Sequence, residues 1–347
     1  MIRPEMARAG SRVPRRTILS AFLPVVIAVS GCGSTKAPQP VPTNARTLRL
    51  APQTLRVGGA PVAIAAGAGA IWVADNTGGL VLRLDPRSGR QIGKPARVGA
   101  GPLAITAGPG GAWVATGAGT VEHLDPGTGA PDGPPVTVAD PNGIATGGGS
   151  VWVTNRQAST VTRIDERTRR VVGAAIRVGR TPADIVAGFG SIWIANVDDG
   201  TVSRLDERTG KPIGGPIPVA DAQVLALAVD RDGVWVASTD IRIGERVHVR
   251  RLDPRSGQFD DVRAAIPAGV PADLAAGLGR IWLTDTGTVL PGRRRTAAVR
   301  PLAPGSETSQ AGVRVGDDPR GIALSADAVW TANAGDGTVT RIAVGSP

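Results

Sequence analysis

The chain has 347 residues, and its 48 Gly and 29 Pro make up about a fifth of it, whereas Tyr is absent. This composition suits many short strands and tight turns better than helices, and no segment after the N-terminus is long and apolar enough for a spanning helix. The formal net charge is +10, but residues 1–31 hold five Arg and one Glu, which leaves +6 (10 − 4) for residues 32–347. Because most of the remaining Arg are spread singly along the chain, we expect them on solvated faces and expect no nucleic-acid partner.

The first 31 residues have the layout of a secretory signal. Three arginines precede an apolar run over residues 18–29, and Ser30 and Gly31 then lead into Cys32, the single cysteine of the chain. A cysteine directly after small residues is similar to a bacterial lipobox, which implies that Cys32 becomes the mature N-terminus and carries lipid. The alternative is an ordinary signal peptide with an incidental cysteine. We therefore expect export to the outer face of the cell membrane, and the export route stays open because residues 14–19 are also similar to a twin-arginine signal.

A tether is predicted after the signal peptide. Residues 33–47 contain three Pro among Ser, Thr, Asn and Lys, which is typical of a semi-rigid linker. The predicted organisation is a signal peptide over 1–31, a Pro-rich tether over 32–52, and one repeat domain over 53–347.

The seven tryptophans reveal the repeat. They are Trp72, Trp113, Trp152, Trp193, Trp235, Trp282 and Trp330, at spacings of 41, 39, 41, 42, 47 and 48 residues. Eleven residues before each Trp stands a residue that we call the marker of its repeat. The markers are Pro61, Pro102, Pro141, Pro182, Val224, Pro271 and Pro319. One fixed spacing in seven copies predicts seven equivalent structural units, with each Trp packed between neighbouring units.

The fourth repeat shows what each unit is. Its segments 182–188, 192–196, 201–206 and 216–219 are short and rich in β-branched or apolar residues, and Gly, Asn and Asp separate them. Such runs are antiparallel strands joined by hairpins, and four strands in about 42 residues form a propeller blade. The Asp residues that end the third strands are expected to cap turns; they are Asp85, Asp125, Asp165, Asp206 and Asp253.

The ends of the repeat region predict how the ring closes. The seventh repeat has three strands, the last over residues 338–342, and residues 54–57 before the first repeat match the fourth strands of other repeats. We expect this N-terminal strand to complete the last blade. The predicted fold is all-β, a seven-bladed β-propeller with four antiparallel strands per blade.

The repeat phrases carry a family resemblance over residues 54–345. Trp-Val-Ala-Asp at 72–75, Trp-Val-Thr-Asn at 152–155 and Trp-Ile-Ala-Asn at 193–196 are each followed by segments like Gly-Thr-Val-Ser-Arg-Leu-Asp at 200–206. They resemble YVTN-type propellers and the wider group of streptogramin lyases, of the virginiamycin B lyase type. The resemblance implies the propeller fold and, for the lyases, a His and a Glu near the channel acting with Mg²⁺.

This chain departs from the lyase pattern. One lyase blade motif resembles Pro-His-Gly-Ile, but the position after each marker here holds Val62, Leu103, Asn142, Ala183, Leu225, Ala272 or Arg320. The two histidines, His123 and His248, fall in third strands, away from the predicted channel. The sequence also lacks a Gly-x-Ser-x-Gly elbow and a Cys/His cluster. We predict no catalytic residues, metal ligands or cofactor, with Mg²⁺ implied only by the lyase-like alternative.

Candidate binding residues follow from the topology. Residues just after the strand markers should line the channel mouth, where Asn142, Asp184, Asp273 and Arg320 are polar. These side chains either hydrate a water-filled channel or bind a ligand.

Two connections on the same face are lengthened. From Trp to the end of the third strand takes 18 residues in the fifth repeat and 21 in the sixth, against 12 or 13 in the others. The sixth-repeat insertion contains the run Arg293, Arg294 and Arg295. Arginine clusters suit carboxylate or phosphate groups, and insertions in repeat proteins often mark the working face, although a tolerated surface insertion is the alternative.

The sequence favours a non-catalytic binding or interaction propeller, monomeric and lipid-anchored outside the cell membrane. Its expected partner is a protein, an envelope polymer or a small ligand, with anionic chemistry favoured. The alternative is a virginiamycin B lyase-like enzyme that cleaves a cyclic depsipeptide by metal-assisted elimination.

Overall fold

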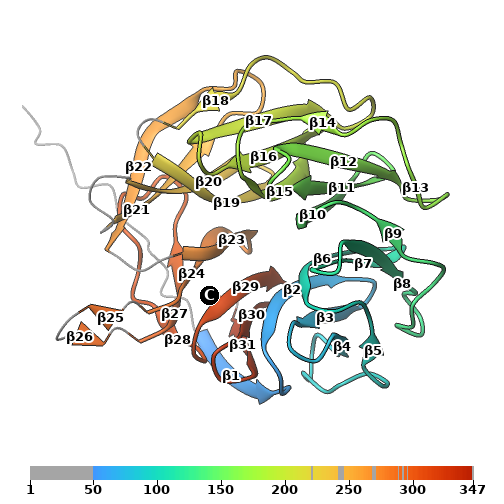
Figure 1. Ribbon diagram of the computed structural model, residues 1–347. Coiled ribbons are helices and arrows are strands. Elements are labelled where there is room, and N and C mark those ends of the chain that lie inside the picture. The colour runs from blue at the N-terminus through green and yellow to red at the C-terminus, as the bar shows by residue number, and fades with distance from the viewer. Residues whose placement is uncertain are drawn as a thin grey trace, which may run out of the picture. The chain divides into compact units, whose positions relative to one another are not determined.

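The computed structural model describes residues 50–219, 222–240, 246–267, 271–287, 289–290, 293–294 and 296–345 (Figure 1). These residues belong to one compact unit, Thr47–Pro347. The predicted signal peptide, Cys32 and most of the predicted tether lie outside the described residues. Within the described part of the chain, no helix is long and apolar enough to cross a membrane.

Seven antiparallel sheets follow one another along the chain, as predicted, and form the blades of a propeller (Figure 1). Blade 1 is β2 (Pro61–Gly67), β3 (Ala70–Asp75), β4 (Leu80–Leu84) and β5 (Ala96–Arg97), and blade 2 is β6 (Pro102–Gly108), β7 (Gly111–Thr116), β8 (Thr120–Leu124) and β9 (Val136–Thr137). Blade 3 is β10 (Pro141–Gly147), β11 (Ser150–Asn155) and β12 (Thr160–Asp165), with β13 (Arg170–Val171) and β14 (Ile176–Arg177) both paired to β12. Blade 4 is β15 (Pro182–Gly188), β16 (Ser191–Asn196), β17 (Thr201–Asp206) and β18 (Ile217–Pro218).

The last three blades differ in their connections. Blade 5 is β19 (Ala222–Asp230), β20 (Gly233–Asp240), β21 (Arg246–Leu252) and β22 (Phe259–Pro267). Blade 6 is β23 (Pro271–Gly277), β24 (Arg280–Asp285), β27 (Ala298–Leu302) and β28 (Val313–Arg314), and β25 (Val289–Leu290) and β26 (Arg293–Arg294) form a small hairpin between its second and third strands. Blade 7 is β29 (Pro319–Leu324), β30 (Ala328–Asn333) and β31 (Thr338–Val344), completed by β1 (Leu50–Arg56).

The ring closes through β1, as the sequence predicts. β1 pairs antiparallel with β31 over seven residues, from Leu50 opposite Val344 to Arg56 opposite Thr338. The strand begins at Leu50, earlier than the predicted residue 54. The first strand of each blade contacts the first strand of the next blade, and β29 contacts β2, so these seven strands lie innermost around the axis of the ring (Figure 1).

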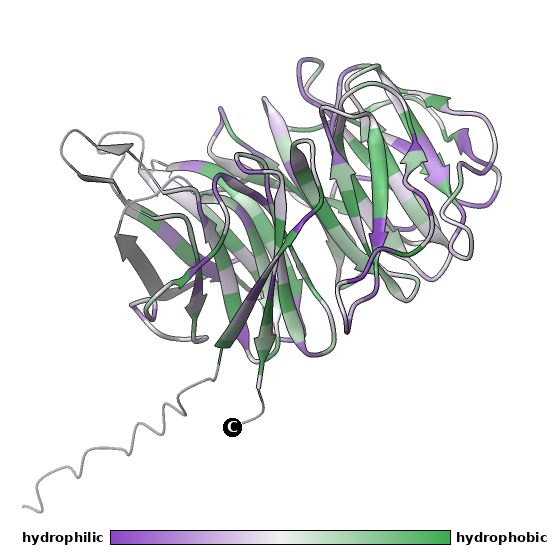
Figure 2. Cartoon of the chain, turned by 90° about the horizontal axis from the view of Figure 1, so that it is seen from below, coloured by the Kyte–Doolittle hydropathy of each residue, from purple (hydrophilic) through white to green (hydrophobic). Residues whose placement is uncertain are grey.

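The two faces of the ring follow from the antiparallel order. The connections between second and third strands and those between successive blades lie on one face, called here the mouth face. The turns between first and second strands and between third and fourth strands lie on the opposite face. Figure 2 shows hydrophobic residues concentrated along the strands and hydrophilic residues mainly in the connections.

Each tryptophan packs between neighbouring blades, as predicted. Trp72 of blade 1, for example, shares one hydrophobic cluster with Ile105 and Leu124 of blade 2, and Trp330 of blade 7 shares one with Ile71 of blade 1. All seven tryptophans are at most 5% exposed. The same apolar contacts therefore hold successive blades together around the whole ring.

Four arginines do not lie on solvated faces, contrary to what the sequence predicted for most arginines of the repeats. The third-strand arginine directly opposite the Trp does not point into solvent in blades 1, 3, 4 and 7. It lies over the indole, half-buried, with its guanidinium carbon 5.2, 5.1, 4.6 and 5.7 Å from the ring centroid for Arg83, Arg163, Arg204 and Arg341. Cation–π attraction and the packing of the aliphatic stem explain why a charged residue recurs beside a buried Trp.

The predicted turn caps are present. The backbone N–H three residues later donates to Oδ1 of each Asp at 2.6–2.7 Å, as from Ser88 to Asp85 and from Thr209 to Asp206. These donors favour the charged carboxylate, and the N–H of Ser88 is the main cause that lowers the pKa of Asp85. The recurring Asp is therefore a structural residue of the opposite face.

Candidate functional site

A backbone irregularity places side chains at the channel mouth. Each first strand shifts register against its second strand directly after the marker residue, as between Pro182 and Ile185 and between Pro271 and Leu274. The shifted segment holds two residues in blades 3, 4 and 6 and one residue in blades 1, 2, 5 and 7, and all of these residues leave the regular ladder and line the centre of the ring. Bulges of this kind commonly redirect side chains beside functional sites.

These segments enclose a central cavity of about 270 Å³. The four polar residues predicted from the sequence all line it: Asn142 of blade 3, Asp184 of blade 4, Asp273 of blade 6 and Arg320 of blade 7. The other lining side chains are apolar, among them Val62, Leu103 and Leu225. Polar groups from four separate blades thus converge on one small space, and their part in binding is a proposal taken up below.

The two carboxyl groups of the cavity join neighbouring blades. Asp184 accepts the N–H of Ile185 at 2.8 Å on one oxygen and the N–H of Leu227, in blade 5, at 2.6 Å on the other. Asp273 likewise accepts the N–H of Leu274 at 2.8 Å and that of Ile322, in blade 7, at 2.9 Å. Because the bulges interrupt the regular ladder there, these carboxyl groups supply hydrogen bonds that the strands lack.

The surroundings raise the pKa of both carboxyl groups. Removal from water raises the pKa of Asp273 to about 8, and the negative charge of Asp184 contributes to this rise. Burial raises the pKa of Asp184 as well, against the opposing effect of its two N–H donors. The pair therefore disfavours two negative charges in the channel at neutral pH.

Asn142 and Arg320 are held in different ways. The Asn142 amide donates to the carbonyl of Ala183 at 3.2 Å, which links blade 3 to blade 4. The Arg320 Nε lies 2.8 and 2.9 Å from the carboxylate oxygens of Asp318, and its side chain is 57% exposed. Arg320 is thus the cavity residue with the most freedom to meet a partner from solution.

The arginine run lies largely outside the described residues. The backbone of Arg293 and Arg294 forms β26, whereas Arg295 and all three side chains belong to the part of the chain that is not described. The hairpin stands in a connection between second and third strands, which places it on the mouth face. The blade 5 insertion is taken up partly by the long strands β20 and β21, and residues 241–245 are not described.

Neither histidine lines the cavity. His123, in β8, lies 2.9 Å from the carbonyl oxygen of Gly110 and 3.2 Å from the carboxylate of Asp132, and its ring centroid is 4.6 Å from that of Trp113. It takes the place that arginine holds over the Trp in other blades. His248 lies in β21 and is 8% exposed. Among the residues that the structure describes, no group of three or more His, Cys, Asp or Glu is arranged to hold a metal ion.

The cross-blade role of the carboxyl groups was not predicted, although the sequence carries a trace of it. The tripeptide Pro-Ala-Asp occurs twice, at 182–184 and 271–273. Identical tripeptides at the same position in two repeats indicate that the two aspartates have the same structural role.

Comparison with known proteins assigns the fold and leaves the activity open. No protein-family model and no curated protein sequence matches this chain. Among solved structures, a streptogramin B lyase superposes with a TM-score of 0.69 at 19% identity, over 85% of this chain and 98% of the other. A catalytically inactive histidine-to-alanine variant of virginiamycin B lyase from Staphylococcus aureus, with quinupristin, superposes with a TM-score of 0.69 at 18% identity. That match covers 85% of this chain and 99% of the lyase chain. Hydrazine synthase of Kuenenia stuttgartiensis superposes with a TM-score of 0.68 at 16% identity, over 82% of this chain and 95% of the synthase chain. At these identities the likeness concerns the β-propeller fold alone.

Proposed function

We propose that this chain is an extracytoplasmic binding propeller that holds its partner on the mouth face, with the central cavity as the contact point, and that it acts without catalysis. The observation that supports this most is the state of the cavity carboxyl groups. Each oxygen of Asp184 and Asp273 already accepts a backbone N–H, one from the next residue of the same strand and one from the first strand of the next blade. Groups committed to the ring in this way line a binding surface more readily than they shuttle protons.

The proposed partner carries a carboxylate or phosphate group. Arg320 is the cationic side chain at the cavity, and the arginine run 293–295 stands in a connection on the same face. A guanidinium group binds such anions through two parallel hydrogen bonds.

An envelope-capture experiment tests this proposal. Purified protein is immobilised and exposed to a detergent extract of the native envelope, as are Arg320→Gln and the combined change of Arg293, Arg294 and Arg295 to Gln. We expect both variants to lose a component that the parent protein captures, and we expect higher salt to weaken that capture in the parent. The matched control is Arg208→Gln, an exposed turn residue of the opposite face.

The control variant should capture the same component as the parent protein. If all four proteins retain an identical set of components with identical salt sensitivity, the mouth face is not the binding surface. If only Arg208→Gln loses a component, the binding surface is the opposite face.

One observation favours the lyase-like alternative. The pKa of Asp273, near 8, is suited to general acid–base chemistry at neutral pH. The histidine-to-alanine variant of virginiamycin B lyase, which has a similar fold, is catalytically inactive, whereas no histidine lines the cavity of this chain. Incubation with quinupristin and Mg²⁺, followed by mass spectrometry, separates the two functions, because turnover would contradict a non-catalytic role.

The location outside the membrane is proposed on sequence grounds. The signal-like segment and the small residues before Cys32 support a lipid anchor. Cys32→Ala is expected to move the protein from the membrane fraction to the soluble fraction, or to stall its processing. A variant that stays in the membrane fraction with a diacylated mass would disprove lipidation at Cys32.

A further inference from the structure

Large apolar side chains that stay exposed are concentrated on the opposite face of the ring. Among the described residues five such side chains are at least 37% exposed, and the one of these on the mouth face is Leu103, at the central cavity. The other four lie in connections of blades 3 and 4 on the opposite face. We call them the apolar tips: Val171, Val172, Phe189 and Ile213. Packing in the core does not explain why these four positions are apolar.

Phe189 stands in the two-residue turn between β15 and β16. Its backbone has a φ of 54°, in the left-handed region that is unfavourable for a bulky side chain. Leu278 takes the same place in blade 6 with the same φ, but its side chain packs on the cluster between blades 6 and 7. Phe189 is 45% exposed and belongs to none of the hydrophobic clusters of the described chain. Backbone strain without burial is typical of a residue with a function.

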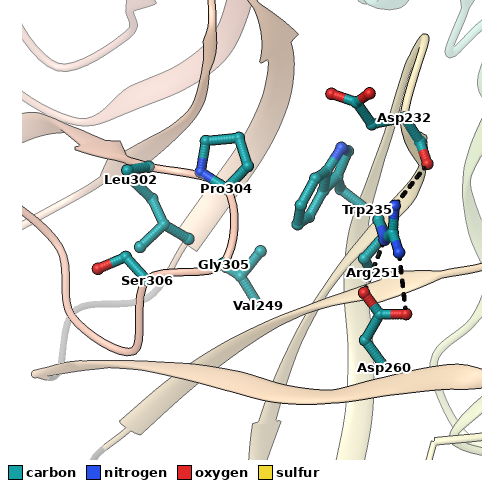
Figure 3. A pocket seen from close by; sticks show the side chains of 10 residues that line it. Asp232, Trp235, Val249, Arg251, Asp260, Leu302, Pro304, Gly305 and Ser306 are labelled. Atoms are coloured by element: carbon teal, nitrogen blue, oxygen red, sulfur yellow. Dashed lines mark hydrogen bonds and ion pairs between the residues drawn. The ribbon is translucent and has the colours of Figure 1, made fainter. Parts of the chain in front are cut away.

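The neighbouring blade 5 shows that apolar tips are not a general property of this face. Its corresponding turn holds Arg231 at the position of Phe189. Figure 3 shows the charged side chains beside this turn, which are Asp232 and the ion pair between Arg251 and Asp260, at the pocket between blades 5 and 6. The apolar tips of blades 3 and 4 therefore have a polar surface next to them.

Cations accompany the apolar tips. The structure describes the opposite-face turns of blades 3 and 4 in full, and every exposed charged residue in them is a cation. These cations are Arg167, Arg170, Arg208 and Lys211. The four carboxylates of the same turns are half-buried, and two of them, Asp165 and Asp206, are turn caps whose Oδ1 accepts backbone N–H groups. The outward surface of these turns thus combines apolar groups with positive charge.

The described chain also enters the propeller at this face. Leu50 pairs with Val344, whose N–H donates to the carbonyl of Asp327 in the first turn of blade 7 at 2.8 Å, so β1 begins at the opposite face. The segment 33–49 precedes it, and its 17 residues (49 − 32) span at most about 60 Å when extended. With the lipid anchor proposed above, this face lies within reach of a membrane.

We propose that the opposite face of blades 3 and 4 docks on the surface of an anionic phospholipid bilayer. The apolar tips enter the boundary between headgroups and acyl chains, and Arg167, Arg170 and Lys211 bind lipid phosphates. Separate apolar tips beside long cationic side chains suit a bilayer, whereas a protein interface has a contiguous, closely packed centre. The docking rests on the proposed function only for the nearby membrane, and it leaves the mouth face free for a partner. The envelope capture uses a detergent extract without a bilayer, so Arg208→Gln remains its control.

Vesicle flotation tests the docking without the lipid anchor. The chain that begins at residue 32 carries Cys32→Ala, so that it has no lipid, and it is mixed with vesicles of phosphatidylcholine and phosphatidylglycerol at millimolar lipid. We expect it to float with the vesicles, and we expect higher salt to weaken its binding. Phe189→Asp should lower the partition coefficient about tenfold, because the burial of one aromatic ring is lost. This variant should stay folded, since Asp tolerates a positive φ better than Phe.

Two further variants make the outcome specific. Ala118→Asp, at an exposed position in a mouth-face turn, adds the same charge and should float as the parent chain does. Phe189→Trp adds an exposed indole to seven that are at most 5% exposed, and brominated lipid should quench its fluorescence. The proposal is overturned if the parent chain does not float, if Ala118→Asp and Phe189→Asp lose equal binding, or if the Phe189→Trp emission shifts with protein concentration alone, which would assign this face to a second copy of the chain. Because this chain carries no lipid, a failed flotation contradicts neither the lipid anchor nor a partner on the mouth face.

Discussion

A chain shortened to begin at Gly59 is expected to unfold at least 10 °C below one that begins at Cys32, roughly the shift that a loss of several kcal/mol gives in a domain of this size. The shortened chain lacks β1, so it loses the seven-residue ladder with β31 and the packing of Leu55 and Val57 on the blade 7 cluster. It also exposes the edge of β31, which should promote aggregation. Thermal unfolding followed by circular dichroism, with light scattering for aggregation, measures both effects.

A milder change provides the control for this deletion. A chain that begins at Thr47 keeps β1 and removes only residues outside the described strands, so it should unfold at the same temperature as the longer chain. Leu55→Ser should fall between them, since it keeps the strand but removes apolar contacts, at a cost of about 1–3 kcal/mol. Equal unfolding temperatures for the chains that begin at Cys32 and Gly59 would show that β1 does not hold the ring closed.

Stability is expected to fall as the pH rises from 5 to 8, and Asp273→Asn should flatten this dependence. In the folded protein the pKa of Asp273 is raised from 3.8 to about 8 by burial and by the charge of Asp184. Between these values the folded state binds more protons than the unfolded state, so the free energy of unfolding decreases with pH, by at most about 1.4 kcal/mol per pH unit. Urea unfolding at pH 5, 6, 7 and 8 gives the slope.

The asparagine variant should also be less stable than the parent protein at pH 5. An amide has one acceptor oxygen, so it cannot accept the N–H groups of both Leu274 and Ile322 as the carboxyl group does. The control is Asp206→Asn, because the hydroxyl and N–H of Thr209 lower the pKa of Asp206. The stability that Asp206 contributes is present above its unfolded pKa and is lost only at more acidic pH, so its removal should leave the slope between pH 5 and 8 unchanged. A parent protein with no slope in this range would argue against a strained pair of carboxyl groups in the channel.

Most of the features predicted correctly from the sequence lie within one repeat. The Trp position and the alternation of strand residues recur in all seven repeats, and the Asp turn recurs in five. Each of these features depends on residues that are close together in the sequence. The closing strand was predictable because residues 54–57 match fourth strands elsewhere. The channel residues were predictable because the marker fixes where each first strand begins.

The features missed from the sequence lie between strands or between blades. Arg83 and its equivalents stack on Trp because the two residues are paired across strands, a relation that net charge and spacing do not express. The charge of Asp184 in blade 4 raises the pKa of Asp273 in blade 6. These blades are not adjacent, and only the closed ring brings the two residues together.

The way in which β1 joins the ring has a mechanical consequence. Leu50 lies at the opposite face and Arg56 at the mouth face, so a force between the preceding chain and a load on the mouth face acts along the strand axis. The hydrogen bonds of an antiparallel pair run perpendicular to the strands, and all pairs from Leu50–Val344 to Arg56–Thr338 then bear the force together in shear. A force between the two chain ends would instead separate the pairs one at a time from Leu50–Val344. The same strand therefore resists tension from a bound load much better than it resists peeling at its free end.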